Sequence, residues 1–349
     1  MAIKKKILII GQTPPPYGGQ ALMIQALLNY RFTYVDLIHI RLNFSKDFNE
    51  MGKFRFYKFT ALIKTILLTW IYRFKYDVKI LYYGPAGPNK MAMYRDMLLL
   101  ISIRFLFKKV IFHSHAGGSS LLYKDLNPIS KYFYRIAFFK PNIIIKLTKY
   151  SHGDEDILKA KKIVIVPNGI PDDYKINGYE KKRKDKRDKI INILYTGAIY
   201  EERGIKELIE AVNLLKKKNY TFCLKIIGIF IDSKFSNDIN NLIEKYKLEN
   251  FIQFLGTKVG NDKWDIFFKS DIFCFPTKVP SETFGIVLIE AMQFKIPIVA
   301  SRWNGIPYLI DDKCDGLLTT PSDYVDIANK IEILINNKEL RYRLGEKGR

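Results

Sequence analysis

Cysteine is scarce in this chain of 349 residues, which contains only three. Cys223 and Cys274 lie far apart in apolar, strand-like runs, and an odd number of thiols cannot form a complete set of disulfides. The sequence therefore excludes a small disulfide-stapled fold and indicates buried thiols in a reducing compartment.

Long apolar runs are also missing. The most apolar stretches, residues 61–74 and 97–107, contain basic residues and are shorter than the roughly 20 residues that a membrane-spanning helix needs. The lysines near the N-terminus precede only a short apolar run that ends at Gly11 without a small-residue cleavage site, so no signal peptide is predicted. We expect a cytoplasmic protein.

Acidic residues are far fewer than basic ones, and the formal net charge is +22. Residues 1–180 hold 28 basic and 12 acidic residues, a charge of +16, whereas residues 181–349 hold 29 and 23, a charge of +6. Such a field could attract nucleic acid, an anionic membrane surface or a phosphorylated substrate. A lysine-rich solvated surface explains the same composition, so charge alone does not choose among these readings.

Short β-branched runs alternate with longer amphipathic runs in both halves of the chain. Helices are predicted at residues 20–30, 54–74 and 89–107 between the first four strands, and the pattern breaks at residues 167–189 before it restarts. This rhythm is typical of parallel sheets covered by helices. We predict an α/β protein with two Rossmann-like αβα domains that face a cleft, residues 1–170 and 191–349, joined by a linker at residues 171–190.

Two glycines, Gly18 and Gly19, follow a proline-rich turn after the first strand and stand at the start of a predicted helix. Backbone amides at a helix start, with no side chain in the way, can bind a phosphate. The spacing is not the dinucleotide-binding pattern, and a plain strand-to-helix turn explains it equally well.

Two histidines, His113 and His115, end the fourth predicted strand, where strand alternation places them on the same side. A metal pair is conceivable, but no neighbouring Asp, Glu or Cys supplies a third ligand at a recognisable spacing, so no metal site is predicted. We expect His115 to touch the substrate with its imidazole; a satisfied core histidine is the alternative.

Two glutamates eight residues apart mark the C-terminal half. Glu282 precedes a predicted helix start and Glu290 lies within the helix, in the otherwise apolar run IVLIEAM. Free amides near Phe284 and Gly285 would attract a phosphate, and carboxylates accept hydrogen bonds from sugar hydroxyls. Burial of a carboxylate is costly without partners, so Glu290 is predicted to have one.

Residues 280–307 closely resemble the E-x7-E region of retaining glycosyltransferases of family 4, which have the two-Rossmann GT-B fold. Other family-like pieces occur in order along the chain. They are the glycine pair after the first strand, the strand-end histidine, residues 167–170, and the segment from Gly197 to Gly204. The resemblance covers nearly the whole chain and is tighter in the second domain.

The resemblance implies a donor site for a UDP- or GDP-sugar, without a metal ion or other cofactor. Glu290 would bind the donor ribose, while Glu282 and the Phe284 and Gly285 amides would hold the transferred sugar and the β-phosphate. Arg203 stands where the family usually has a diphosphate-binding lysine. The implied catalytic residues are His115, Glu282 and Arg203, and the implied donor-binding residues are Gly18, Gly19, Gly197, Arg203, Phe284, Gly285 and Glu290.

The sequence also departs from the family pattern. Ala198 replaces an arginine that usually follows the glycine after the first strand of the second domain, and Tyr308 occupies a place where a glutamate is common. The chain ends at Arg349, before the terminal helix that usually crosses back to the first domain, which suggests truncation at the C-terminus. Because Ala198 replaces that arginine, one of the two cations expected to contact the leaving diphosphate is missing.

The expected reaction is transfer of a sugar to a saccharide acceptor in surface polysaccharide or glycan assembly, with retention of anomeric configuration. No D-x-D pair stands at a strand end, so metal-independent stabilisation of the leaving phosphate is predicted. The basic first domain, with aromatic-rich runs at residues 54–76 and 97–109, favours a lipid-linked acceptor and peripheral docking on an anionic inner membrane face. The alternative to membrane docking is that these runs are core helices with exposed lysines at their edges. The alternatives to sugar transfer are a nucleotide-sugar epimerase and a basic nucleic-acid-binding protein, and nucleic acid is not predicted as a partner.

Overall fold

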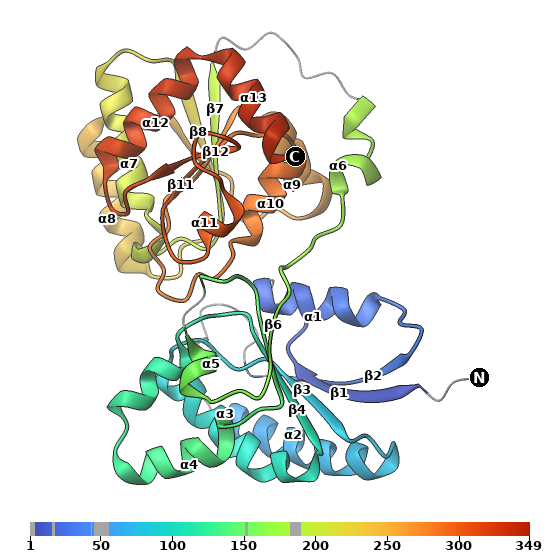
Figure 1. Cartoon of the computed structure of the whole chain (residues 1–349). Helices are drawn as coiled ribbons and strands as arrows, with labels where there is room; N and C mark the ends of the chain where they lie inside the picture. The colour runs from blue at the N-terminus through green and yellow to red at the C-terminus, as the bar shows by residue number, and fades with distance from the viewer. Residues whose placement is uncertain (1–3, 16–17, 43, 45–55, 151–152, 182–189) are drawn as a thin grey trace. The chain divides into compact units, whose positions relative to one another are not determined.

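The computed structural model describes the chain except for residues 1–3, 16–17, 43, 45–55, 151–152 and 182–189 (Figure 1). The chain divides into two compact units, Met1–Gly169 and Ile170–Arg349. Among the helices of the described residues, none combines the length and the apolar character needed to cross a bilayer.

The first unit is built on a six-stranded parallel sheet with the strand order β2-β1-β3-β4-β5-β6. The strands are β1 (Lys5–Gly11), β2 (Val35–Arg41), β3 (Ile80–Tyr83), β4 (Lys109–Ser114), β5 (Ile143–Lys146) and β6 (Ile163–Ile165). The helices are α1 (Gly19–Asn29), α2 (Phe56–Lys75), α3 (Lys90–Ile103), α4 (Pro128–Phe138) and the short α5 (Asp154–Ile157), with 3-10 turns η2 (Arg104–Leu106) and η3 (Ser119–Asp125).

The direction of the crossovers separates the helices of the first unit into two layers. The connection from β1 to β2 runs one way along the sheet. The connections from β2 to β3, from β3 to β4 and from β4 to β5 run the other way. Because such crossovers are right-handed, α1 covers one face and α2, α3 and α4 cover the other, as Figure 1 shows. The residues of β1 alternate accordingly: Leu8 and Ile10 pack in one core and Ile9 in the other.

The second unit repeats the architecture with the strand order β12-β11-β10-β7-β8-β9, again parallel throughout. The strands are β7 (Ile191–Thr196), β8 (Phe222–Ile227), β9 (Ile252–Phe254), β10 (Ile272–Phe275), β11 (Ile298–Ser301) and β12 (Gly316–Thr319). The helical segments are α6 (Asp173–Ile176), η4 (Tyr179–Lys181), η5 (Glu201–Arg203), α7 (Ile205–Lys217), α8 (Ser233–Tyr246), α9 (Gly260–Phe268), α10 (Ile286–Gln293), α11 (Ile306–Leu309), α12 (Tyr324–Asn336) and α13 (Lys338–Gly348).

The two parallel sheets confirm the predicted α/β class. Strand β10 is buried along its whole length, as expected of a central parallel strand covered on both faces. All three cysteines are free thiols: Cys274 is buried in β10, Cys223 is half-buried in β8 and Cys314 is exposed.

The described part of the segment predicted as a linker belongs to the second unit. Tyr179 is 1% exposed and packs its ring against Phe268 and Phe294. Its hydroxyl donates a hydrogen bond of 2.6 Å to Asp265. Residues 182–189, the charged stretch, lie outside the described residues. Residues 173–181 therefore help to build a core and do not simply connect two domains.

Candidate active site

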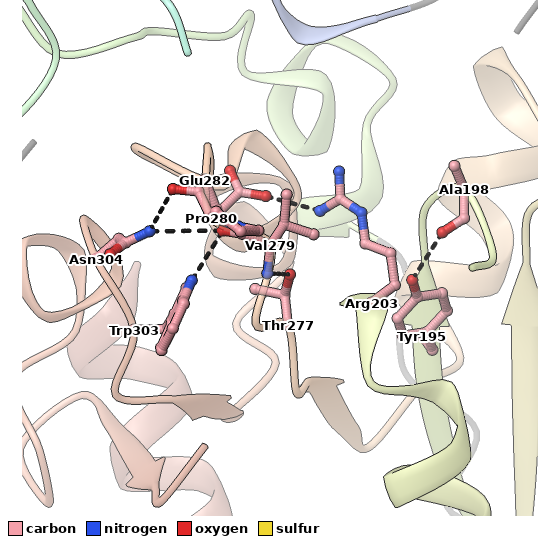
Figure 2. Close-up of polar contacts among 9 residues, drawn as sticks. All are labelled: Tyr195, Ala198, Arg203, Thr277, Val279, Pro280, Glu282, Trp303 and Asn304. Carbon is pink, nitrogen blue, oxygen red and sulfur yellow. Dashed lines mark hydrogen bonds and ion pairs between the residues drawn. The ribbon is translucent and has the colours of Figure 1, made fainter. Parts of the chain in front are cut away.

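Three loops of the second unit leave the carboxyl ends of the neighbouring strands β7, β10 and β11. Ligand sites of open parallel sheets form at this edge, so these loops are placed to share one. The loop after β7 supplies Arg203, the loop after β10 supplies Glu282, and the turn after β11 supplies Trp303 and Asn304 (Figure 2).

Arg203 and Glu282 form a largely buried ion pair between two of these loops, with Nη1 of the arginine 2.7 Å from Oε2 of the glutamate. The guanidinium also lies over the ring of Tyr200, 5.5 Å from its centroid. Burial lowers the pKa of Arg203, but the charge and hydrogen bond of Glu282, together with the nearby Tyr200 and Tyr195 hydroxyls, outweigh it and raise that pKa above its ordinary value. Arg203 thus stays a cation, and its buried Nε has no hydrogen-bond partner among the described residues.

The loop after β10 is fixed by side chains from the turn after β11. The indole N–H of Trp303 donates to the carbonyl oxygen of Val279 at 2.8 Å, and the side-chain amide of Asn304 donates to the carbonyl oxygen of Pro280 at 2.9 Å (Figure 2). These bonds hold the backbone directly before Glu282. The carboxylate is therefore positioned by a rigid support.

Glycines let the three loops cross with their backbones almost in contact. Gly204 has a φ of +75°, and a Cβ there would lie 2.0 Å from the carbonyl oxygen of Pro276. At Gly305 a Cβ would lie 1.8 Å from the carbonyl oxygen of Thr283. Since the clashing atoms are backbone atoms, they cannot swing aside as a side chain can. Each crossing therefore requires glycine.

We expect Gly204→Ala to destabilise the second unit by about 3 kcal/mol or more, because a left-handed alanine and a backbone clash add together. Gly256→Ala is the matched control: Gly256 also has a positive φ, +65°, but no atom lies within 4 Å of the added Cβ. That control should lose only about 1–2 kcal/mol. Urea unfolding, monitored by the fluorescence of the second unit, measures the free energy of unfolding of both variants. Equal losses of unfolding free energy in the two variants would refute the tight crossing.

Glu290 on α10 pairs with a residue that the sequence analysis did not single out. Its Oε1 lies 2.6 Å from Nζ of Lys263, on α9. The lysine ammonium also lies over the ring of Trp264, 4.7 Å from its centroid. Burial raises the pKa of Glu290, and the charge of Lys263 opposes that rise. The predicted need for a partner is met, while Oε2 remains buried without one among the described residues.

The start of α10 presents backbone amides next to Glu282. Gly285 caps the helix with a φ of +79°, in the left-handed region. The Phe284 side chain is 2% exposed and belongs to the core, so this residue offers the site its backbone only. Among the described residues, no carbonyl or side chain accepts a hydrogen bond from the amides of Phe284 and Gly285. Such amides at a helix start attract anions.

The first unit holds three of the predicted site residues, Gly18, Gly19 and His115. Gly18 caps α1, and the exposed Gly19 is the first residue of that helix. His115 follows β4 and stacks on His113 with ring centroids 3.9 Å apart, so the predicted shared side is confirmed. The Tyr82 hydroxyl is hydrogen-bonded to Nδ1 of His113.

Burial keeps both imidazoles neutral at pH 7. It lowers the pKa of His113 to about 4, and burial together with the neighbouring His113 lowers the pKa of His115 well below its ordinary value. Within the described residues, no group of three or more His, Cys, Asp and Glu side chains is arranged to hold a metal ion. His115 is therefore an uncharged ring at pH 7 in the ligand-free protein.

Two further positions refine the sequence analysis. Gly197 has a φ of +147°, and its carbonyl oxygen would lie 1.9 Å from a Cβ at Gly228. Ala198 uses its carbonyl to accept a hydrogen bond of 3.1 Å from the Tyr195 hydroxyl (Figure 2). A second cation near these loops, Lys278, was not predicted as a site residue and pairs with Glu207 at 2.6 Å.

Residues 178–349, just under half of the chain, match the model of the family glycosyl transferases group 1. An uncharacterized glycosyltransferase of Methanocaldococcus jannaschii is 30% identical over 233 residues, 67% of this chain and 60% of the relative. The capsular polysaccharide biosynthesis glycosyltransferase CapM of Staphylococcus aureus is 27% identical over 225 residues, 62% of this chain and 58% of CapM. The chain thus spans about 60% of the length of these relatives.

Solved structures establish the fold across both units. Sucrose-phosphate synthase of Thermosynechococcus elongatus superposes with a TM-score of 0.68 at 18% identity, covering 99% of this chain and 93% of that chain. HepE of Anabaena, solved in complex with UDP, gives a TM-score of 0.65 at 16% identity, covering 98% and 93%. Together with the two parallel six-stranded sheets, these likenesses identify the GT-B glycosyltransferase fold.

Proposed function

We propose that the protein transfers a sugar from a UDP- or GDP-sugar to a saccharide acceptor. The observation that carries this proposal is the buried Arg203–Glu282 pair, 2.7 Å apart, beside the unpartnered amides of Phe284 and Gly285. A fixed guanidinium and helix-start amides suit a diphosphate, and the adjacent carboxylate suits the hydroxyls of the attached sugar. The match of residues 178–349 to the glycosyl transferases group 1 model supports the same assignment.

Glu290 is assigned to the donor ribose. Its Oε1 is held by Lys263, and its Oε2 has no partner among the described residues, so one oxygen remains to accept hydrogen bonds from ribose hydroxyls. Gly18 and Gly19 are assigned to the diphosphate and His115 to the transferred sugar, as the resemblance implies. Gly197, in the loop after β7, is assigned to the same donor site, as the resemblance implies.

The catalytic task is to stabilise the negative charge that develops on the departing diphosphate. Arg203 and the amides of Phe284 and Gly285 supply fixed positive potential for that charge, and on this basis the reaction is independent of a metal ion. Both glutamates are engaged by cations, Glu282 by Arg203 and Glu290 by Lys263, which argues against a covalent glycosidase-like nucleophile. Retention, which the resemblance to family 4 implies, is therefore assigned to front-face attack. The acceptor oxygen bonds to the anomeric carbon on the side from which the diphosphate leaves, and the leaving phosphate accepts the proton of the acceptor hydroxyl.

The acceptor is proposed to be a lipid-linked saccharide in the assembly of a surface polysaccharide. The name of the Staphylococcus aureus relative places that protein in capsular polysaccharide biosynthesis. The net charge of +22 is suited to an acceptor that carries phosphate groups.

A thermal-shift screen of UDP-, GDP- and ADP-sugars tests the donor assignment and metal independence together. One UDP- or GDP-sugar is expected to raise the unfolding temperature of the second unit equally in EDTA and in Mg²⁺, because Arg203 and the amides bind the diphosphate directly. Stabilisation that requires Mg²⁺ would refute metal independence. If no nucleotide sugar raises the unfolding temperature, the donor site is refuted. Release of an altered sugar in the absence of any acceptor would favour an epimerase.

A further inference from the structure

Helix α2 carries large apolar side chains on its outward face as well as on the face that covers the sheet, where Leu62 is buried and Ile66 and Leu68 pack against the core. Its inward positions include the buried Thr65 and Thr69, whose hydroxyls donate back to the carbonyl oxygens of Ala61 at 2.8 Å and Thr65 at 2.7 Å. Large apolar residues recur every three or four positions on the outward face, and each is between 38% and 64% exposed: Phe59, Ile63, Leu67, Trp70, Ile71 and Phe74. This spacing forms one continuous stripe.

The neighbouring helices extend the stripe into a surface. Helix α3 packs against both α2 and α4, and the three form one layer on the same face of the sheet (Figure 1). Their outward apolar residues are Met91, Tyr94 and Leu98 on α3, Phe105 in η2, and Ile129, Tyr132, Phe133 and Ile136 on α4. We call these residues and the stripe of α2 the apolar helix layer.

One aromatic contact and one hydrogen bond join α2 to the end of α3 and to η2, which follows it. The ring of Trp70 lies edge-on to that of Phe105 at 5.6 Å, and its indole N–H donates to the carbonyl oxygen of Ser102 at 3.2 Å. Scattered exposed apolar residues are common on soluble proteins, but large exposed apolar residues concentrated on three helices that pack side by side indicate a surface that binds something apolar.

The charge around the layer is almost entirely positive. Residues 56–139 contain nine lysines and four arginines but only three aspartates. Of these aspartates, Asp96 is buried against Arg95, and Asp77 is paired with Lys79 and Arg73. Exposed basic residues on or beside the layer are Lys64, Lys75, Lys90, Lys108, Lys124 and Arg135. The matching partner is therefore apolar and negatively charged.

We propose that the apolar helix layer docks on the surface of an anionic lipid bilayer. The aromatic and aliphatic side chains would enter the boundary between headgroups and acyl chains, and the lysines would contact anionic headgroups. A second copy of the chain is a poorer occupant, because it would bring an equal positive charge against the first. This proposal does not rest on the proposed sugar transfer, since vesicle binding needs neither donor nor acceptor.

Vesicle sedimentation tests the proposal with the full chain. Sucrose-loaded vesicles of phosphatidylcholine containing about 30% phosphatidylglycerol are expected to bind the protein at least about tenfold more tightly than pure phosphatidylcholine vesicles, because of the lysine fringe. The double variant Leu67→Gln/Phe74→Gln, at positions 58% and 64% exposed, should lose about tenfold or more of this binding. Both substitutions are on the surface, and an unchanged thermal melt verifies folding.

A matched control and a depth probe sharpen the result. The double variant Ile333→Gln/Tyr342→Gln removes two side chains of similar exposure, 45% and 71%, from the second unit and should bind like wild type. Acyl-brominated lipid should quench Trp70, and Trp70→Phe should abolish that component. Equal binding by Leu67→Gln/Phe74→Gln and wild type would overturn the proposal. So would a concentration-dependent dimer, seen by light scattering, that this variant disrupts.

Discussion

Arg203→Met is expected to slow turnover of the donor about 100- to 1,000-fold. The methionine keeps most of the buried stem but removes the cation that pairs with Glu282 at 2.7 Å and, in the proposed reaction, faces the departing diphosphate. The loss should fall mainly on kcat, because the charge on the leaving group develops in the transition state. Steady-state kinetics with the donor found by the thermal-shift screen would measure it.

Two comparisons separate this role from a structural one. Arg203→Lys keeps the charge without the planar fork and should recover part of the rate. Arg302→Met removes an arginine that also forms an ion pair at 2.7 Å, with Asp312, but is 55% exposed, and it should stay within about twofold of wild type. If Arg203→Met also turned over the donor within a few-fold of wild type, Arg203 would have no role on the leaving group.

Glu290→Gln should weaken donor binding about 10- to 100-fold, because the amide accepts the ribose hydrogen bonds less well than a carboxylate. It should also destabilise the second unit by about 3 kcal/mol, because Lys263 loses its buried counter-charge. Isothermal titration with the nucleoside diphosphate measures the first effect. Urea unfolding of the ligand-free protein measures the second.

The double variant Glu290→Gln/Lys263→Met distinguishes the two effects. It removes both charges, so it should regain part of the stability without regaining nucleotide affinity. The control Glu346→Gln breaks a more exposed pair, with Lys295 at 2.9 Å, and should alter stability by less than about 1 kcal/mol. Recovery of full nucleotide affinity in the double variant would show that Glu290 acts only through packing.

Much of the fold could be predicted from local pattern because parallel strands are buried on both faces and read as apolar runs. The position of His115 at the end of a strand and the helix start at Gly285 also followed from this local pattern. The burial of Glu290 could also be anticipated, since its neighbours in the helix are apolar. These features depend on residues close together in the sequence.

Features that depend on distant packing were not predictable in the same way. Lys263 reaches Glu290 only because α9 packs near α10, and nothing in the spacing along the chain pairs them. Tyr179 lay in a segment that read as a polar turn, yet its ring completes the core of the second unit. For α2, periodicity indicated amphipathic character, but the outward direction of its apolar stripe appeared only once Thr65 was seen to face the sheet.

The glycine crossings have a consequence for engineering donor choice. Because Gly204 meets Pro276 and Gly305 meets Thr283 backbone to backbone, the loops of the proposed donor site are interlocked and cannot be exchanged one at a time. In a chimera that takes one loop from a relative, the backbone of that loop would no longer fit against the two unchanged neighbouring loops. Grafts should therefore move residues 197–204, 276–285 and 302–305 together from one parent, and libraries should vary side chains while leaving the crossings untouched.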